Sequence, residues 1–117
     1  MPLVGKLFHQ IQISSKKGKL KNQRKVSKEE LEQVIKSQTV NGILYCAATG
    51  VKLVHDITSN PLQPSVDRIN CSRGYELGNI RIVACTYNLM RRTWDDKVVI
   101  EAIIQMAASI DKRVGQK

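Results

Sequence analysis

Two polar side chains in the second half of the chain, Asp67 and Asn88, have the chemistry of a metal site. They fall in residues 64–92, whose pattern predicts a strand, a loop with glycines, a second strand and a short helix. Asp67 lies near the end of the first strand, and Asn88 lies on the helix, which we expect to pack back across the hairpin. An acid and an amide oxygen that converge from two elements are suitable ligands for a hard cation such as Mg²⁺.

The elements that would position these side chains follow from local patterns. Residues 66–69 form an apolar-rich run, and residues 80–84 alternate as a short buried strand does. Between them, Gly74 and Gly78 allow the chain to turn tightly. Residues 85–92 then fit one or two helical turns with basic residues at the far end.

This stretch resembles the ββα-metal finger of HNH (His-Me finger) endonucleases, in particular small phage and bacterial proteins with a PS-x-DRI, S-x-GY and GN signature. The match covers roughly the middle and C-terminal two-thirds of the chain in the same order. Upstream, residues 46–53 are similar to the family's C-x-x-(T/L)-G-x-x-L turn. The signature residues are Pro64, Ser65, Asp67, Arg68, Ile69, Ser72, Gly74, Tyr75, Gly78 and Asn79, followed on the helix by Asn88, Arg91 and Arg92.

The resemblance implies a DNA endonuclease that hydrolyses phosphodiester bonds with the help of Mg²⁺ or Mn²⁺. Asp67 and Asn88 would be the metal ligands, and Asn79 would brace the loop and the base. The residues alone leave simpler interpretations open. Asp67 would then form a surface ion pair with Arg68 or Arg91, and Asn79 would be an ordinary loop residue.

The chain departs from the HNH pattern at the general base. Arg68 stands where the general motif has a histidine, and arginine stays protonated at physiological pH. Arg68 would instead clamp a phosphate or stabilise charge in the transition state. In a second register of the motif the base would be Asn70, which cannot accept a proton either. The only histidines are His9 and His55, of which His55 lies in the predicted loop before the finger.

Two functions of different classes are therefore expected. The first is a divalent-metal-dependent endonuclease of HNH type. The second is a catalytically inactive HNH-fold protein that binds nucleic acid, or an accessory, even inhibitory, phage protein. The missing histidine favours the second, whereas the joint presence of Asp67, Asn79 and Asn88 favours the first.

The basic residues are concentrated at the N-terminus. Residues 1–26 contain seven of the 19 lysines and arginines and none of the ten acids, so they carry +7 of the net charge of +9. Such a segment suits a phosphate backbone, double-stranded DNA above all, although it would also serve as a solvated tail. The residues expected to bind nucleic acid are Lys16, Lys17, Lys19, Lys21, Arg24, Lys25, Arg73, Arg81, Arg91 and Arg92. Sequence-specific binding would need a homodimer, a partner protein or the basic arm in a groove.

Composition places the chain among ordinary globular proteins. It has 117 residues, 42% apolar and 25% charged, which suits one domain. No apolar run approaches membrane-spanning length and the start lacks a signal-peptide core, so we expect a cytoplasmic protein, in a bacterial host if a phage encodes it.

The three cysteines, Cys46, Cys71 and Cys85, form no complete C-x-x-C pair. This spacing predicts buried or half-buried thiols and no structural zinc.

The predicted fold is α+β, a small single domain in which the ββα finger packs against flanking helices. Residues 1–26 are expected to be a basic arm, and residues 27–117 the HNH-like domain with the finger at 64–92. A capping box of Ser27 and Glu30 predicts a helix over residues 28–38. A second helix, over residues 94–113, carries a stripe that we expect to form core: Val99, Ile103, Met106 and Ile110, widened by Val98, Ala102 and Ala107.

Overall fold

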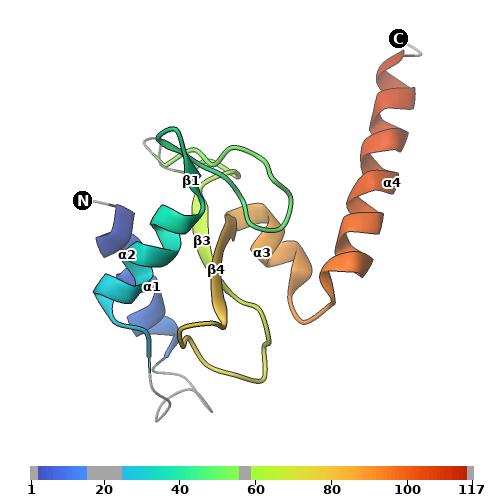
Figure 1. Cartoon of the computed structure of the whole chain (residues 1–117). Coiled ribbons are helices and arrows are strands. Elements are labelled where there is room, and N and C mark those ends of the chain that lie inside the picture. The colour runs from blue at the N-terminus through green and yellow to red at the C-terminus, as the bar shows by residue number, and fades with distance from the viewer. Residues whose placement is uncertain (1–2, 16–24, 56–58, 116–117) are drawn as a thin grey trace.

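The computed structural model describes residues 3–15, 25–55 and 59–115. Its helices and two small antiparallel sheets confirm the α+β class (Figure 1). The elements, in chain order, are α1 (Leu3–Ser14), α2 (Lys28–Ser37), β1 (Thr39–Val40), β2 (Ile43–Leu44), β3 (Pro64–Arg68), β4 (Ile80–Ala84), α3 (Cys85–Arg91) and α4 (Asp96–Gly115).

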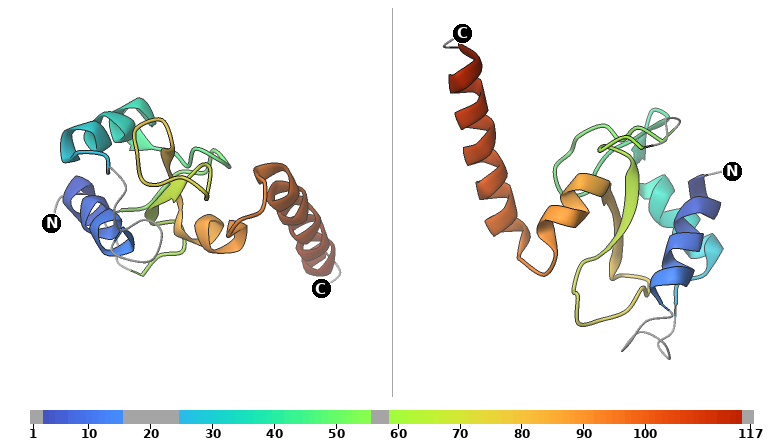
Figure 2. Two further views of the ribbon diagram at one scale, coloured as in Figure 1. Left: turned by 90° about the horizontal axis from the view of Figure 1, so that it is seen from below. Right: turned by 180° about the vertical axis from the view of Figure 1, so that it is seen from behind.

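The β3–β4 hairpin is the centre of the molecule. α1 and α2 lie on one side of it and α3 lies on the other, so the hairpin is enclosed between helices (Figures 1 and 2). Val66 and Ile82 are fully or almost fully buried, and they stand opposite each other in the register of the two strands. Leu31 of α2 and Ile11 of α1 complete the core from the helical side.

Two glutamines cover the open edges of this two-stranded sheet. On the β3 edge, the Gln10 amide accepts from the Val66 N–H (3.3 Å) and donates to the Val66 carbonyl (3.4 Å). On the β4 edge, the Gln38 amide accepts from the Ile82 N–H and donates to the Ile82 carbonyl, both at 2.8 Å. Buried strand edges need partners for their backbone groups. A glutamine amide has one donor side and one acceptor side, so each one stands in for a neighbouring strand.

Several predicted elements are confirmed. α2 begins behind the capping box, in which the Ser27 hydroxyl accepts from the Glu30 N–H and the Glu30 carboxylate accepts from the Ser27 N–H. The two finger strands and the helix after them occur within one or two residues of the predicted bounds. The three cysteine thiols are free and are buried or half-buried, as predicted from their number and spacing.

The N-terminal boundary of the domain differs from the predicted one. Residues 3–14 form α1 and not part of an arm, and Leu7 and Ile11 belong to the domain core. The apolar residues of this segment recur at helical spacing, and the lysine-rich part begins only after α1. The predicted contacts of Lys16, Lys17, Lys19, Lys21 and Arg24 lie outside the described residues.

The prediction that the stripe of the last helix forms core is wrong for most of its length. Val99 is 1% exposed and Ile103 is half-buried, but Met106 is 46% and Ile110 is 57% exposed. The reason is geometric, because α4 packs on α3 only at its start and then runs away from the domain (Figures 1 and 2). Within the described part of the chain, no helix combines the length and the apolar character needed to cross a membrane.

The edge glutamines give a first testable prediction. Gln38→Ala should lower the free energy of unfolding by about 2 kcal/mol, because the buried Ile82 N–H loses its acceptor. Gln33→Ala, at an exposed position of α2, the helix that Gln38 follows, is the matched control and should change it by less than about 0.5 kcal/mol. Urea denaturation measures both values. Equal stability of the two variants would show that the edge bonds contribute nothing.

Candidate functional site

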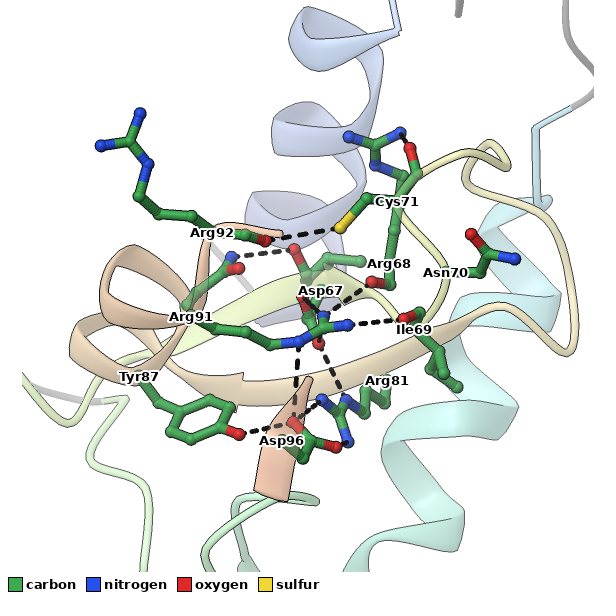
Figure 3. Close-up of polar contacts among 12 residues, drawn as sticks. Asp67, Arg68, Ile69, Asn70, Cys71, Arg81, Tyr87, Arg91, Arg92 and Asp96 are labelled. Atoms are coloured by element: carbon green, nitrogen blue, oxygen red, sulfur yellow. Dashed lines mark hydrogen bonds and ion pairs between the residues drawn. The ribbon is translucent and has the colours of Figure 1, made fainter. Parts of the chain in front are cut away.

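The two predicted metal ligands, Asp67 and Asn88, lie between the hairpin and α3. Ser65 and Asp67 are two residues apart on β3, so their side chains leave the same face of the strand. Asn88 and Arg91 are three residues apart on α3, so they also share a face. Asn88 meets Ser65 and Arg91 meets Asp67, which shows that α3 lies across the strand as expected for a ββα unit (Figure 3).

The Asp67 carboxylate is buried between two arginines. It is 4% exposed, and both its oxygens accept from Nη1 of Arg91 at 2.9 Å. Oδ2 also accepts from Nε of Arg81 at 2.8 Å, because Arg81 stands opposite Asp67 in the strand register. A buried carboxylate is stable only when it is paired and hydrogen-bonded, and Asp67 satisfies both conditions.

Arg91 ties three parts of the chain together. Besides Asp67, its guanidinium donates to the carbonyls of Arg68 (2.9 Å) and Ile69 (2.6 Å) at the end of β3. Its Nε donates to the Trp94 carbonyl at 3.1 Å, in the turn before α4. Figure 3 shows the guanidinium between Asp67 and Ile69. Arg91 is 5% exposed, so one of the simpler interpretations of the sequence, the ion pair of Asp67 with Arg91, is found in the structure, but as an interior pair.

Arg81 extends the network to the first residue of α4. It donates to both oxygens of Asp96, at 2.8 and 2.7 Å, and the Tyr87 hydroxyl also donates to Asp96. The hydrogen bonds from Arg81 lower the pKa of Asp96 most, and the bond from Tyr87 lowers it further. Burial acts in the opposite direction, and the resulting pKa of Asp96 is about 2. Burial, together with the bond to Asp96, raises the pKa of Tyr87. Burial disfavours the charged form of Arg81, yet its bonds to Asp96 and Asp67 raise its pKa.

Asn79 and Arg68 hold the loop between the two strands. Asn79 is 1% exposed, accepts from the Asn70 N–H (2.9 Å) and donates to the carbonyls of Asn70 (3.1 Å) and Gly74 (2.8 Å). The Arg68 guanidinium donates to the carbonyls of Cys71 (2.8 Å) and Arg73 (3.0 Å) and lies over the Tyr75 ring. Asn79 therefore braces the loop. Arg68 points into the loop and makes no ion pair with Asp67.

Asn88 donates from Nδ2 to the Ser65 hydroxyl (2.9 Å) and the Val66 carbonyl (3.2 Å). Gln10 reaches the same hydroxyl from α1, at 3.1 Å. The Asn88 amide thus joins α3 to the strand next to the edge that Gln10 covers. Asn88 comes from the helix and Asp67 from the strand. The Asn88 side chain binds Ser65 and Val66 of β3, whereas the Asp67 side chain binds Arg81 and Arg91, so the two side chains do not bind each other.

The arrangement of Asp67 does not fit a divalent cation. Three hydrogen bonds from two guanidinium groups occupy its oxygens, and both groups would repel a metal ion at that position. Within residues 3–15, 25–55 and 59–115, no three His, Cys, Asp or Glu side chains gather as a metal cluster. His9 on α1 and His55 before the finger are both exposed, so neither belongs to the buried network around Asp67. Metal binding by Asp67 and Asn88 stays a prediction that requires Asp67 to leave its arginines.

The predicted phosphate-binding arginines fall into two groups. Arg91 is buried and Arg81 is half-buried, and the bonds above commit both guanidiniums to carboxylates and carbonyls. Arg73 and Arg92 are exposed, at the finger loop and at the end of α3, and Lys25 is exposed before α2. Arg73 pairs with Glu76, whereas the Arg92 side chain points away from the network in Figure 3.

No family model matches the chain, and no curated protein or solved structure matches it significantly. The resemblance to HNH endonucleases therefore depends on the signature residues alone.

Sequence reasoning missed Asp96 as a member of the network. Asp96 lies in the first turn of α4, where the helix dipole alone accounts for an acid. The rest of β4, the helix α3 and a turn separate Asp96 from Arg81 in the chain, so neither periodicity nor a motif indicates their pairing. Gln10 was missed for the same reason, because its partners are 55 and 56 residues away in the sequence.

Removal of the central arginine should be costly. Arg91→Ala should lower the free energy of unfolding by about 3 to 5 kcal/mol, because it removes one of the two cations that pair with the buried Asp67 carboxylate. Arg92→Ala, at the next and exposed position, removes the same charge and should cost less than about 0.5 kcal/mol. Chemical denaturation of the two variants tests the difference, and similar costs would contradict a structural role for Arg91.

The low pKa of Asp96 predicts a pH dependence. Folding lowers this pKa from 3.8 to about 2, so the stability it contributes is present above about pH 4 and is lost as the pH falls towards 2. In Asp96→Asn the loss of stability between these pH values should be smaller than in the wild type. Denaturation midpoints at a series of pH values measure it. Parallel curves for the two proteins would rule out the Asp96 contribution.

Proposed function

We propose that this chain binds nucleic acid, double-stranded DNA in the first place, in the cytoplasm, with the ββα unit as a rigid scaffold for exposed cations. The observation that supports this most directly is the hydrogen bond from the Val26 N–H to the Tyr75 carbonyl, at 2.7 Å. It fixes the end of the basic segment to the finger loop. Lys25, at the end of the basic segment, therefore lies beside the finger loop.

The cations near this junction come from both parts. Lys25 and Arg73 line the same hollow, of about 230 Å³, together with Glu30 and Glu76. The five basic residues that precede Lys25 within residues 16–24 follow Ser15, whose N–H bonds to the Ile11 carbonyl at the end of α1. The segment therefore starts at a packed helix and ends at the finger loop. High local positive charge of this kind attracts phosphate backbones without reading the base sequence.

The interior network supports binding more than hydrolysis. Two carboxylates, Asp67 and Asp96, pair with two guanidiniums, so the four groups sum to zero charge. Arg68, at the position of the missing base, holds two loop carbonyls and is not turned towards Asp67. The groups that the HNH resemblance assigns to chemistry are engaged in holding the fold.

Hydrolysis of phosphodiester bonds is the second candidate function. It is supported by the packing of α3 on β3, which sets Asn88 against Ser65, two residues before Asp67, as the HNH resemblance implies. An ion at this position would require Asp67 to exchange its arginines for the metal. Hydrolysis therefore requires a rearrangement of Asp67 that DNA binding does not, so the two functions can be tested separately.

Binding is tested by fluorescence anisotropy on a labelled duplex over a range of NaCl concentrations. The logarithm of the association constant should fall as the logarithm of the NaCl concentration rises. In the double variant Lys19→Gln with Lys21→Gln this slope should be less steep by about 1.8, because about 0.9 is lost for each phosphate that is no longer neutralised. Lys36→Gln with Lys52→Gln removes the same charge at exposed positions outside residues 16–25 and should leave the slope nearly unchanged. Equal effects of the two pairs would contradict the proposed interface.

The second candidate is tested with the same proteins on supercoiled plasmid. Incubation with Mg²⁺ or Mn²⁺, against EDTA, should give no nicking if the chain only binds DNA. Metal-dependent nicking that Asp67→Asn and Asn88→Ala both abolish would establish the endonuclease instead. Circular dichroism must show that each variant is folded as the wild type is, because Asp67 also supports the fold and unfolding alone would abolish nicking.

A further inference from the structure

A second hollow, of about 290 Å³, lies at the end of the hairpin that is opposite the finger loop. Pro64 stands opposite Ala84 at this end of the two strands, whereas the finger loop joins their other end. Pro64 lines the hollow, and so does Cys85, the residue after Ala84. The hollow shares no lining residue with the one that Lys25 and Arg73 line at the finger loop, so the two are separate sites.

Two basic side chains line this hollow. Lys6 comes from α1, and His55 comes from the segment before the finger. Within the described residues, neither side chain forms an ion pair or a hydrogen bond, and no Asp or Glu lines the hollow. A lysine ammonium has three donors and no acceptor, and an imidazole has at least one N–H donor in either form. The hollow therefore offers positive charge and unused donors.

The Ser65 hydroxyl adds a buried donor to the same hollow. Ser65 is only 7% exposed, and its oxygen accepts from the amide of Gln10 at 3.1 Å and from that of Asn88 at 2.9 Å. These two bonds use both acceptor positions of the hydroxyl, whereas its own proton has no acceptor among the described residues. A buried donor without a partner costs free energy. An oxygen atom that enters the hollow would remove this cost.

The remaining lining determines what kind of molecule the hollow fits. The Cys85 thiol is free and half-buried, and Leu3, Leu7 and Pro64 supply apolar surface. The volume is close to the lower end of the range for small-molecule sites, which begins at about 300 Å³. The hollow thus has more room than a bare inorganic ion needs. A suitable ligand has an anionic head with several oxygens and a small organic group.

We propose that this hollow binds a phosphate monoester. A terminal phosphate carries a charge of about −1.5 to −2 at neutral pH and has three acceptor oxygens. These oxygens match the donors of Lys6, His55 and Ser65, which reach the hollow from three parts of the chain. The organic group of the ester then lies against Leu3 and Leu7. The site is independent of the proposed DNA-binding surface, because none of the residues assigned to nucleic-acid binding lines it.

Calorimetric titration with adenosine monophosphate tests the proposal. The monophosphate should bind, whereas adenosine, which lacks the phosphate, should not. Lys6→Gln should weaken binding of the monophosphate by about tenfold, because it removes one charge-assisted hydrogen bond. Lys36→Gln removes the same charge from an exposed position of α2 and should leave the Kd within about twofold. Absence of binding by the monophosphate, or equal binding by adenosine, would overturn the proposal.

A second measurement locates the bound phosphate, since the cations at the finger loop also attract anions. In amide NMR spectra the signals of His55, Ser65 and Cys85 should shift on addition of adenosine monophosphate, and those of the finger loop should not. The comparison variant is Lys25→Gln, at the hollow beside the finger loop. If it weakened binding as much as Lys6→Gln does, the phosphate would be bound at the basic surface and the assignment of the hollow would be wrong.

Competition experiments identify the source of the phosphate. Adenosine monophosphate is displaced with an oligonucleotide that is phosphorylated at one end or with the same strand without that phosphate. Displacement by the phosphorylated strand alone supports the site with a nucleic-acid end as its ligand, and displacement by neither strand supports it with a small phosphate ester. Equal displacement by both strands would contradict the proposal, because phosphodiesters would then suffice.

Discussion

The fold depends on one buried carboxylate. Asp67 receives Arg81 from the opposite strand and Arg91 from α3, and Arg81 in turn binds Asp96 at the start of α4. These contacts join the hairpin to both helices that follow it in the chain. Loss of one partner from such a group leaves a buried charge uncompensated, which is among the most costly changes that a small domain can undergo. The total stability of a domain is only about 5 to 15 kcal/mol.

The same network determines which chemistry the site favours. A carboxylate that stabilises the fold through two guanidiniums is held away from a metal ion by their charge, and Arg68 is held by the loop it supports. The described groups left for a ligand around the finger are the exposed cations Lys25, Arg73 and Arg92, of which Lys25 stands next to Val26, the residue that bonds to the finger loop. In the function that we propose, the ββα unit acts through its rigidity and its surface charge. Metal-dependent catalysis would require Asp67 to separate from Arg81 and Arg91.

Local patterns predicted much of the fold. The capping box of Ser27 and Glu30 and the alternation of residues 80–84 depend on neighbours in the sequence, and both elements were found. The site residues were also placed on the right elements. What could not be predicted depends on contacts between distant residues: the edge bonds of Gln10 and Gln38, the pairing of Arg81 with Asp96, and the point at which α4 leaves the core. Periodicity identified the apolar stripe of α4 but carries no information on how much of it the core covers.

The thermal stability of the protein with and without Mg²⁺ tests most directly whether Asp67 is structural. A cation bound to the folded state at a hundred times its Kd would add about 2.7 kcal/mol and raise Tm by about 10 °C. The reference sample contains NaCl at the same ionic strength as the Mg²⁺ sample. If Asp67 is structural, the Tm should be the same in both. A Mg²⁺-specific increase that is lost in Asn88→Ala would contradict the structural role of Asp67, because it would show that Asp67 and Asn88 hold a metal ion.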